Sequence, residues 1–240
     1  MSPLVTGAGR SGLITYKKSK ELITDPYFNN VSLLLHMEGA NNSTTFTDSS
    51  KNNAPITAYG DAKISTSQSK FGSSSATFDG NGDYLVATLA SGFDFGTGDF
   101  TIECFLNLNT LSAGYQNIID FRGGSDSTSP VISVYNAQLQ YFVTPFSRIT
   151  YDSLSQTNTW YHIAVARNSG NTRMFLDGTQ VGSTYSDSNN YINTGSVNIG
   201  RWPPGNSSWL NGFVDEVRIT KGICRYVNNF TAPSSPFPNS

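Results

Sequence analysis

Residues 100–109 read Phe-Thr-Ile-Glu-Cys-Phe-Leu-Asn-Leu-Asn, and this stretch decides the fold class. Apolar side chains recur at every second position, on a face that carries Phe100, Ile102, Cys104, Leu106 and Leu108. A period of two sustained over such a length is typical of a β-strand with one face in a core. Phe105 is the exception, because it falls among the polar residues of the opposite face.

Similar short stretches flank this one on both sides, with turn residues between them. The candidate strands are residues 31–36, 76–78, 84–87, 117–121, 131–135, 138–143, 160–167, 173–176, 197–200 and 213–220. Residues 168–171 can close a hairpin, and Asp177-Gly178 suits a two-residue turn because both residues tolerate positive φ. No helical period separates the strands. The pattern predicts an all-β fold, a two-sheet antiparallel sandwich of the jelly-roll type.

The composition supports a single β domain and excludes several functions. The chain has 240 residues, of which only 13% are charged, against about 25% in an average globular protein. A net charge of −2 argues against strong attraction to nucleic acid. The longest apolar run is far shorter than the roughly 20 residues that span a bilayer, so membrane insertion is not expected. No apolar segment of a secretory signal stands near the start, which predicts synthesis in a cytoplasm.

The two cysteines, Cys104 and Cys224, fit no disulfide or zinc motif. We expect both to be reduced and not bonded to each other. Cys104 lies on the apolar face of its strand, and we expect it to be buried together with Trp160.

The first thirty residues differ from the rest, since they lack alternation and contain the only basic cluster. Two interpretations stay open: a flexible terminus, or an arm that docks on a partner. The apolar content favours assembly, with Lys17, Lys18, Lys20, Tyr27 and Phe28 as the anchoring residues. The predicted organisation is an arm over residues 1–30, a sandwich over residues 31–235 and a C-terminal tail over residues 236–240.

Four segments, taken in order, resemble laminin-G-like domains of the concanavalin A-like jelly-roll group. They are residues 33–39, 71–85, 160–178 and 212–219. The resemblance covers residues 31–235 and implies the sandwich fold. Residues 221–231 and the proline-rich end are similar to domains found in surface proteins of tailed bacteriophages.

The bacteriophage resemblance implies a virion structural or accessory protein, such as a fibre, decoration or tail component. Such a protein would be made in the host cytoplasm and carried on the virion surface, where it could bind a host-surface glycan. Its partners would be other virion proteins, reached through the arm, and further copies of itself. The alternative is a free carbohydrate-binding module without an anchoring role. The two hypotheses differ in whether residues 1–30 contact another chain.

Catalysis is not predicted. Glycoside hydrolases need two carboxylates that face the scissile bond. The nearest pair here is Asp215-Glu216, and adjacent strand residues point to opposite faces. The two histidines, His36 and His162, have no metal-ligand spacing, and His162 is expected to be a satisfied core or edge residue.

Calcium fits the sequence better than zinc does, because Asp215 shares its predicted strand face with apolar residues. A carboxylate there is costly unless it is paired or bound to a metal, and Ca²⁺ prefers oxygen ligands. The family resemblance implies a structural calcium where the first and last strands meet, which maps onto Glu38, Asp48 and Asp215. The alternative is that backbone amides satisfy Asp215.

The loop over residues 200–212 is the strongest candidate for ligand binding. It holds two of the three tryptophans, beside arginine and asparagine. Aromatic rings with one polar group suit a wet recognition surface, and they also dominate protein–protein hot spots. A third interpretation is that the two indoles cap the end of the sandwich. The residues named for a ligand are Tyr191, Arg201, Trp202, Asn206 and Trp209.

Overall fold

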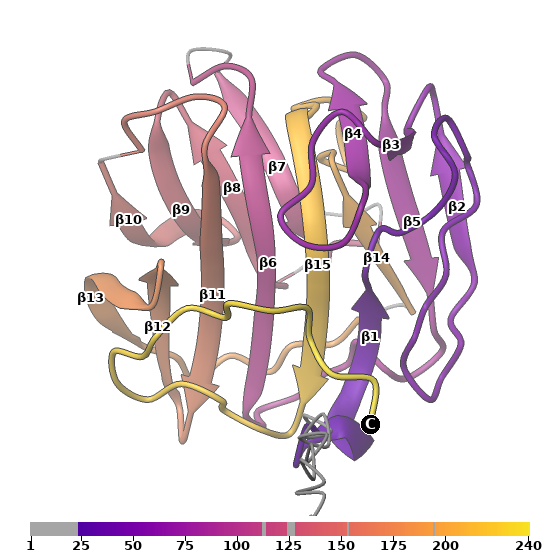
Figure 1. The fold of residues 1–240 in the computed structure, drawn as a ribbon. Helices are drawn as coiled ribbons and strands as arrows, with labels where there is room; N and C mark the ends of the chain where they lie inside the picture. Colours follow the sequence, from indigo (N-terminus) through magenta and orange to yellow (C-terminus); the bar gives the residue numbers. More distant parts are fainter. Residues whose placement is uncertain (1–23, 112–113, 124–127, 153, 194) are drawn as a thin grey trace, which may run out of the picture.

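The computed structural model describes residues 24–111, 114–123, 128–152, 154–193 and 195–240, which form two stacked antiparallel sheets (Figure 1). The predicted two-sheet sandwich is confirmed. Sheet A has the order β13 (Thr179–Ser186), β12 (Asn171–Leu176), β11 (Trp160–Asn168), β6 (Phe100–Leu108), β15 (Asn211–Lys221), β4 (Ser75–Asp79) and β3 (Lys63–Ser65), and β1 (Val31–Leu35) also pairs with β15. Sheet B has the order β10 (Phe146–Tyr151), β9 (Gln138–Val143), β8 (Val131–Tyr135), β7 (Tyr115–Asp120), β14 (Ser196–Ile199), β5 (Tyr84–Thr88) and β2 (Ile56–Tyr59).

Strand β6 lies at the centre of sheet A, between β11 and β15. Its alternating residues Phe100, Ile102, Cys104, Leu106 and Leu108 all belong to the core between the sheets. Cys104 is buried as expected, and Cys104 and Cys224 are both free thiols. Trp160 was expected to be buried as well, but it is only partly buried because it faces away from the main core.

The outer face of sheet A is covered by the two ends of the chain, which explains why Phe105 is apolar. The C-terminal segment runs across β12, β11, β6 and β15 (Figure 1). Phe237 from this segment and Phe28 from the short 3₁₀ helix η1 (Phe28–Asn30) pack with Leu34 and Phe105 in a second buried cluster. The backbone N–H of Asp25 also donates to the carbonyl oxygen of Ser240 at 2.6 Å.

These contacts correct the predicted boundaries. Residues 24–30 and 236–240 pack on the sandwich and are not a separate arm and tail. Phe28 is 9% exposed and therefore belongs to the domain's own packing, whereas Tyr27 is 42% exposed. Lys17, Lys18 and Lys20 lie outside the described residues, so their predicted role in assembly stays a prediction.

A buried ionic network connects sheet A to the chain ends. Arg218 donates to Glu103 at 2.9 Å and to Asp25 at 3.1 Å, while Arg225 pairs with Asp25 at 2.7 Å. His162 lies 3.2 Å from Glu103 and is fully buried, so it is a core histidine as predicted. Burial raises the pKa of Glu103, but the charge of Arg218 and the hydrogen bond from His162 outweigh it and hold that pKa at about 2.

A second histidine fastens the C-terminus, and this contact should depend on pH. His36 Nδ1 lies 2.8 Å from Glu216 Oε1, and His36 Nε2 lies 2.6 Å from Asn239 Oδ1. Burial lowers the pKa of His36. Its hydrogen bonds to Glu216 and Asn239 and the charge of Glu216 raise the pKa by more than burial lowers it, so the net shift is upward. A raised pKa means that the protonated form favours the folded state. This stabilisation is complete below the ordinary pKa of about 6.5 and is lost as pH rises through the raised value.

We therefore expect His36→Gln to lower the melting temperature more at pH 5.5 than at pH 8.5. Thermal denaturation of both proteins at the two pH values measures this difference. An equal effect at both pH values would show that protonation of His36 contributes nothing to docking of the C-terminus.

Candidate functional site

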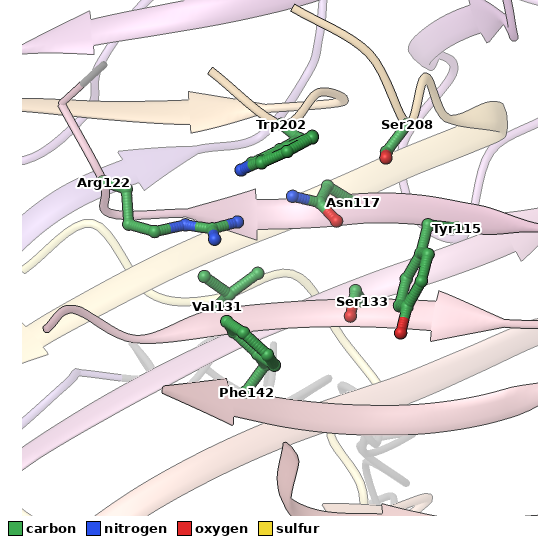
Figure 2. Close-up of a pocket in the computed structure, with 8 residues that line it drawn as sticks. All are labelled: Tyr115, Asn117, Arg122, Val131, Ser133, Phe142, Trp202 and Ser208. Atoms are coloured by element: carbon green, nitrogen blue, oxygen red, sulfur yellow. The ribbon is translucent and has the colours of Figure 1, made fainter. Parts of the chain in front are cut away.

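A pocket of about 190 Å³ opens on the outer face of sheet B (Figure 2). Strands β7, β8 and β9 form its floor and one side, and the loop between β14 and β15 forms the other side. The described residues that line it are Tyr115, Asn117, Arg122, Val131, Ser133, Phe142, Trp202 and Ser208. Ligand pockets for drug-sized molecules usually measure about 300–1,000 Å³. This smaller volume suits one ring of a ligand whose remaining part lies outside the pocket.

The pairing register of sheet B brings the floor residues together. Asn117 pairs with Ser133, and Val131 pairs with Phe142. Since side chains alternate along a strand, these residues face outward while Ile132 between them enters the core. At the edge of the pocket, the exposed rings of Tyr115 and Tyr135 lie 4.3 Å apart. The floor therefore has a polar part, Asn117 and Ser133, beside an apolar part, Val131 and Phe142, and its rim is aromatic.

Hydrogen bonds between backbone groups hold the loop over residues 201–209 against sheet B. Trp202 N donates to the Ser207 carbonyl at 2.8 Å, and Asn117 N on β7 donates to the Ser208 carbonyl at 2.9 Å. Arg201 donates to Asn198 at 3.0 Å and to Asn206 at 2.9 Å, which ties the loop to β14. These contacts fix the Trp202 indole at the side of the pocket.

Arg122, the charged side chain among the described residues that line the pocket, is paired with Asp120. Its Nη2 lies 2.6 Å from Asp120 Oδ2 and its Nε lies 3.0 Å from Asp120 Oδ1. The guanidinium carbon lies 5.4 Å from the Phe142 ring centroid and 5.8 Å from that of Trp202. Burial raises the pKa of Asp120 above its ordinary value, although the hydrogen bonds and charge of Arg122 act in the opposite direction.

Trp202 carries an unsatisfied group. Its indole Nε1 is buried and has no hydrogen-bond partner among the residues that the structure describes. Buried polar groups are nearly always hydrogen-bonded, so an exception needs an explanation such as a bound molecule. A ligand oxygen or a water in the pocket would supply the missing acceptor.

The structure separates the residues that were predicted to bind a ligand. Trp202 lines the pocket, while Arg201 lies 3.7 Å from the centroid of Tyr84, and Trp209 stacks on the same ring at 5.9 Å. Asn206 holds Arg201. Arg201, Asn206 and Trp209 are therefore neighbours of the pocket and do not line it.

Tyr191 requires a correction, because it is not at the surface. The side chain is 1% exposed, and its hydroxyl lies 2.9 Å from that of Tyr141 and 2.8 Å from Asp187 Oδ2. A buried hydroxyl needs such partners. The ring belongs to the core and cannot stack on a ligand at the loop.

The three residues named for calcium do not share a metal site. Asp48 accepts from the backbone N–H groups of Leu34 and Ala54 at 2.9 and 2.8 Å. Asp215 accepts from Lys70 N at 2.8 Å, and Glu38 accepts from the backbone and hydroxyl of Ser73. Over the described ranges, no three His, Cys, Asp or Glu side chains come together as a metal site.

Each of these carboxylates accepts hydrogen bonds from backbone N–H groups or a hydroxyl of its own neighbours, and the three do not face a common point. For Asp215 this is the alternative that the sequence left open. Burial, opposed by backbone hydrogen bonds, raises the pKa of Asp215 to about 7. Calcium binding itself stays a prediction.

The described residues that line the pocket include no carboxylate, and Asp120, which pairs with the lining residue Arg122, is not among them. Within the described part of the chain, no helix is long and apolar enough to cross a membrane. The described lining offers a ligand aromatic rings together with the polar side chains of Asn117, Ser133 and Ser208.

The comparisons with known proteins agree with this fold. A model of the concanavalin A-like lectin/glucanases superfamily, of the laminin G type, matches residues 79–223. No curated protein matches the sequence.

Solved structures similar to this chain include binding domains of botulinum neurotoxins. One is a ligand-binding domain of serotype D in complex with N-acetylneuraminic acid, at 12% identity and a TM-score of 0.62. Another is the binding domain of neurotoxin DC in complex with rat synaptotagmin II, at 14% identity and 0.61. A third concerns neurotoxin type C, whose cell entry depends on two ganglioside molecules, at 14% identity and 0.60. Each match covers 82% of this chain and 49% of the other, so the chain spans about half of those structures.

Proposed function

The chain belongs to the concanavalin A-like lectin/glucanase superfamily, and from this premise we propose that it is a non-catalytic glycan-binding protein whose site is the pocket of sheet B. The observation that carries the proposal is the indole of Trp202, whose buried Nε1 has no partner among the described residues and which lines the same pocket as the polar side chains of Asn117 and Ser133. A sugar ring offers both groups that this arrangement lacks: a hydroxyl oxygen for the indole and an apolar face for the aromatic walls.

The floor residues suit hydroxyl groups. The side-chain Nδ2 of Asn117 donates a hydrogen bond to Asp120 Oδ2 at 2.7 Å, so the side-chain oxygen of Asn117 is the atom that can accept from a ligand. Ser133 and Ser208 add hydroxyls that can donate or accept. Tyr115, Phe142 and Trp202 supply the apolar contacts (Figure 2). A few placed polar groups within aromatic walls are typical of small-ligand sites.

The structural neighbours support a binding role, since one is in complex with N-acetylneuraminic acid, another is in complex with rat synaptotagmin II, and the cell entry of a third depends on two ganglioside molecules. Their likeness to this chain concerns the fold alone, so the ligand of this protein is argued from its own pocket. A protein partner at the same surface is the competing possibility, and a glycan array separates the two.

Trp202→Ala should weaken binding of a glycan identified on an array by about 30-fold or more, the loss expected for a hot-spot residue worth about 2 kcal/mol. Trp209→Ala is the matched control, because Trp209 stacks on Tyr84 and does not line the pocket. We expect the control to change the affinity less than about threefold. Isothermal titration calorimetry measures both, and circular dichroism checks folding. Equal losses in the two variants would place the site elsewhere.

We further propose that the protein displays this domain on a virion surface, attached through residues 1–23 to other virion proteins or to further copies of itself. The support is the similarity of residues 221–231 and of the proline-rich end to bacteriophage surface domains, together with the basic cluster at Lys17, Lys18 and Lys20. Purified particles from the source phage should contain the chain, and a version without residues 1–23 should be absent from them. Incorporation of the shortened chain at the same level would refute the anchoring role.

A further inference from the structure

Tyr115 connects the pocket to a second aromatic surface. It lies at the end of the pocket opposite Arg122 (Figure 2), yet the residue is 49% exposed. Its ring packs on that of Tyr135, with the centroids 4.3 Å apart and an angle of 30° between the ring planes. Tyr135 is 40% exposed and is not among the described residues that line the pocket. The aromatic surface therefore continues from the pocket onto the open face of sheet B.

The backbone holds this tyrosine pair, Tyr115 and Tyr135, in place. The two residues are direct cross-strand partners on β7 and β8. The turn that follows Tyr135 consists of Asn136 and Ala137, both at positive φ, as in the tight hairpins whose twist matches that of the strands. Gly114 N donates to Asn136 Oδ1 at 3.1 Å, and Asn136 N donates to the Gly114 carbonyl at 3.3 Å, which ties this turn to the start of β7. The rings are thus positioned before a ligand arrives, and this lowers the entropic cost of binding.

The size of the pocket requires a longer ligand to leave it. Its volume of about 190 Å³ is below the range of about 300–1,000 Å³ that is usual for ligand sites, so it suits a single ring. A second ring linked to the first would lie outside, and Tyr115 leads from the pocket to the exposed ring of Tyr135. A tyrosine ring offers an apolar face for stacking together with a hydroxyl for hydrogen bonds, and a sugar unit needs both.

We propose that the site binds at least two linked sugar units, the first in the pocket and the second on the tyrosine pair. The inference rests on the proposed glycan-binding function and narrows its ligand class from a single sugar to an oligosaccharide. Tyr135 is the residue that sets this preference for length, because it contacts the second unit and not the first.

An array of neutral oligosaccharides tests the inference, with glucose, galactose, mannose and N-acetylglucosamine each printed as a series of one to four linked units. For the sugar that binds, the unchanged protein should hold the two-unit compound at least about tenfold more tightly than the one-unit compound. Tyr135→Ala should reduce this ratio below about threefold and leave the affinity for the one-unit compound unchanged. Tyr135→Phe should keep most of the gain, because the ring face carries the contact.

Tyr59→Ala is the matched control. Tyr59 is 43% exposed and stacks on its cross-strand partner Tyr84 in the same sheet, with the ring centroids 4.5 Å apart. It therefore loses the same kind of aromatic pair at a distance from the pocket, and the ratio of the two affinities should not change. Titration calorimetry measures the ratio for each variant, and circular dichroism checks folding.

The dependence of affinity on length in the unchanged protein is itself a test that needs no variant. Equal affinity for one and two units would overturn the inference and leave glycan binding intact. The same would follow if the gain from the second unit survived in Tyr135→Ala, or disappeared in Tyr59→Ala, since the second unit would then lie elsewhere. A loss in Tyr135→Phe as large as that in Tyr135→Ala would contradict stacking. Failure to bind any member of the array would overturn the proposed function, and this inference with it.

Discussion

Replacing Arg218 with methionine should lower the free energy of unfolding by about 3–5 kcal/mol, the usual cost of removing one partner of a buried ion pair. Arg218 contacts both Glu103 and Asp25, and the Glu103 side chain is 0% exposed. Without Arg218, the described partners that remain for the Glu103 carboxylate are His162, Tyr226 and the more distant Arg225. Urea denaturation measures the loss.

Two further variants make this test specific. Arg173→Met is the matched control on β12, a half-buried arginine for which the described residues provide no ion pair, and it should change stability by less than about 1 kcal/mol. Glu103→Gln in the Arg218→Met background should recover part of the loss, because it removes the uncompensated charge. No recovery would mean that packing of the arginine stem, and not charge, explains the effect.

The same network predicts sensitivity to acid. The pKa of Glu103 is about 2 in the folded protein against an ordinary value of 4.5. A depressed pKa stabilises the fold fully above the ordinary value, and this stabilisation is lost as pH falls from about 4.5 towards 2.

Removing residues 1–28 should destabilise the domain by about 3 kcal/mol or more, whereas removing residues 1–23 should leave its stability nearly unchanged. The longer deletion takes away Phe28, and loss of a buried phenylalanine side chain typically costs about 3–5 kcal/mol. It also removes Asp25, which leaves Arg218 and Arg225 without one of their carboxylate partners. This expectation differs from the organisation predicted from sequence, which placed residues 1–30 in an arm outside the sandwich.

Denaturation curves of the two shortened chains, measured beside the full chain, test this prediction. The deletion of residues 1–23 is the control for length, since it ends just before the described contacts begin. If residues 29–240 were as stable as residues 24–240, the packing of Phe28 and the ion pairs of Asp25 would contribute nothing to the fold.

The fold was largely predictable because alternation is strong where a strand has one face in the core. Residues 100–108 show this on β6, and the turn at Asp177-Gly178 separates β12 from β13. Strands β2, β3, β10 and β13 were missed, and each lies at the edge of its sheet. In β13, for example, residues 179–186 are mostly polar and exposed, so they carry no apolar period.

The site was much less predictable. Trp202 could be named from its loop, but Asn117, Arg122 and Ser133 become neighbours only through the register of β7 and β8. The available signal was weak, because residues 117–121 and 131–135 carry only isolated polar residues, such as Asn117 and Ser133, which fit any solvent-facing strand. Tyr191 was wrongly placed at the surface because no sequence pattern shows that its hydroxyl has buried partners. Tyr141 is far from it in the sequence, and nothing in the sequence indicates that the nearby Asp187 is buried.

The three tryptophan indoles allow a direct measurement of where a glycan binds. In a ¹⁵N-labelled protein each indole N–H gives one signal, which replacement of each tryptophan in turn assigns. Titration with a neutral oligosaccharide found on the array should shift the Trp202 signal markedly, because its Nε1 gains a partner. The Trp160 signal should stay in place, since that side chain packs on the outer face of sheet A. An unchanged Trp202 signal at saturation would contradict the proposed site.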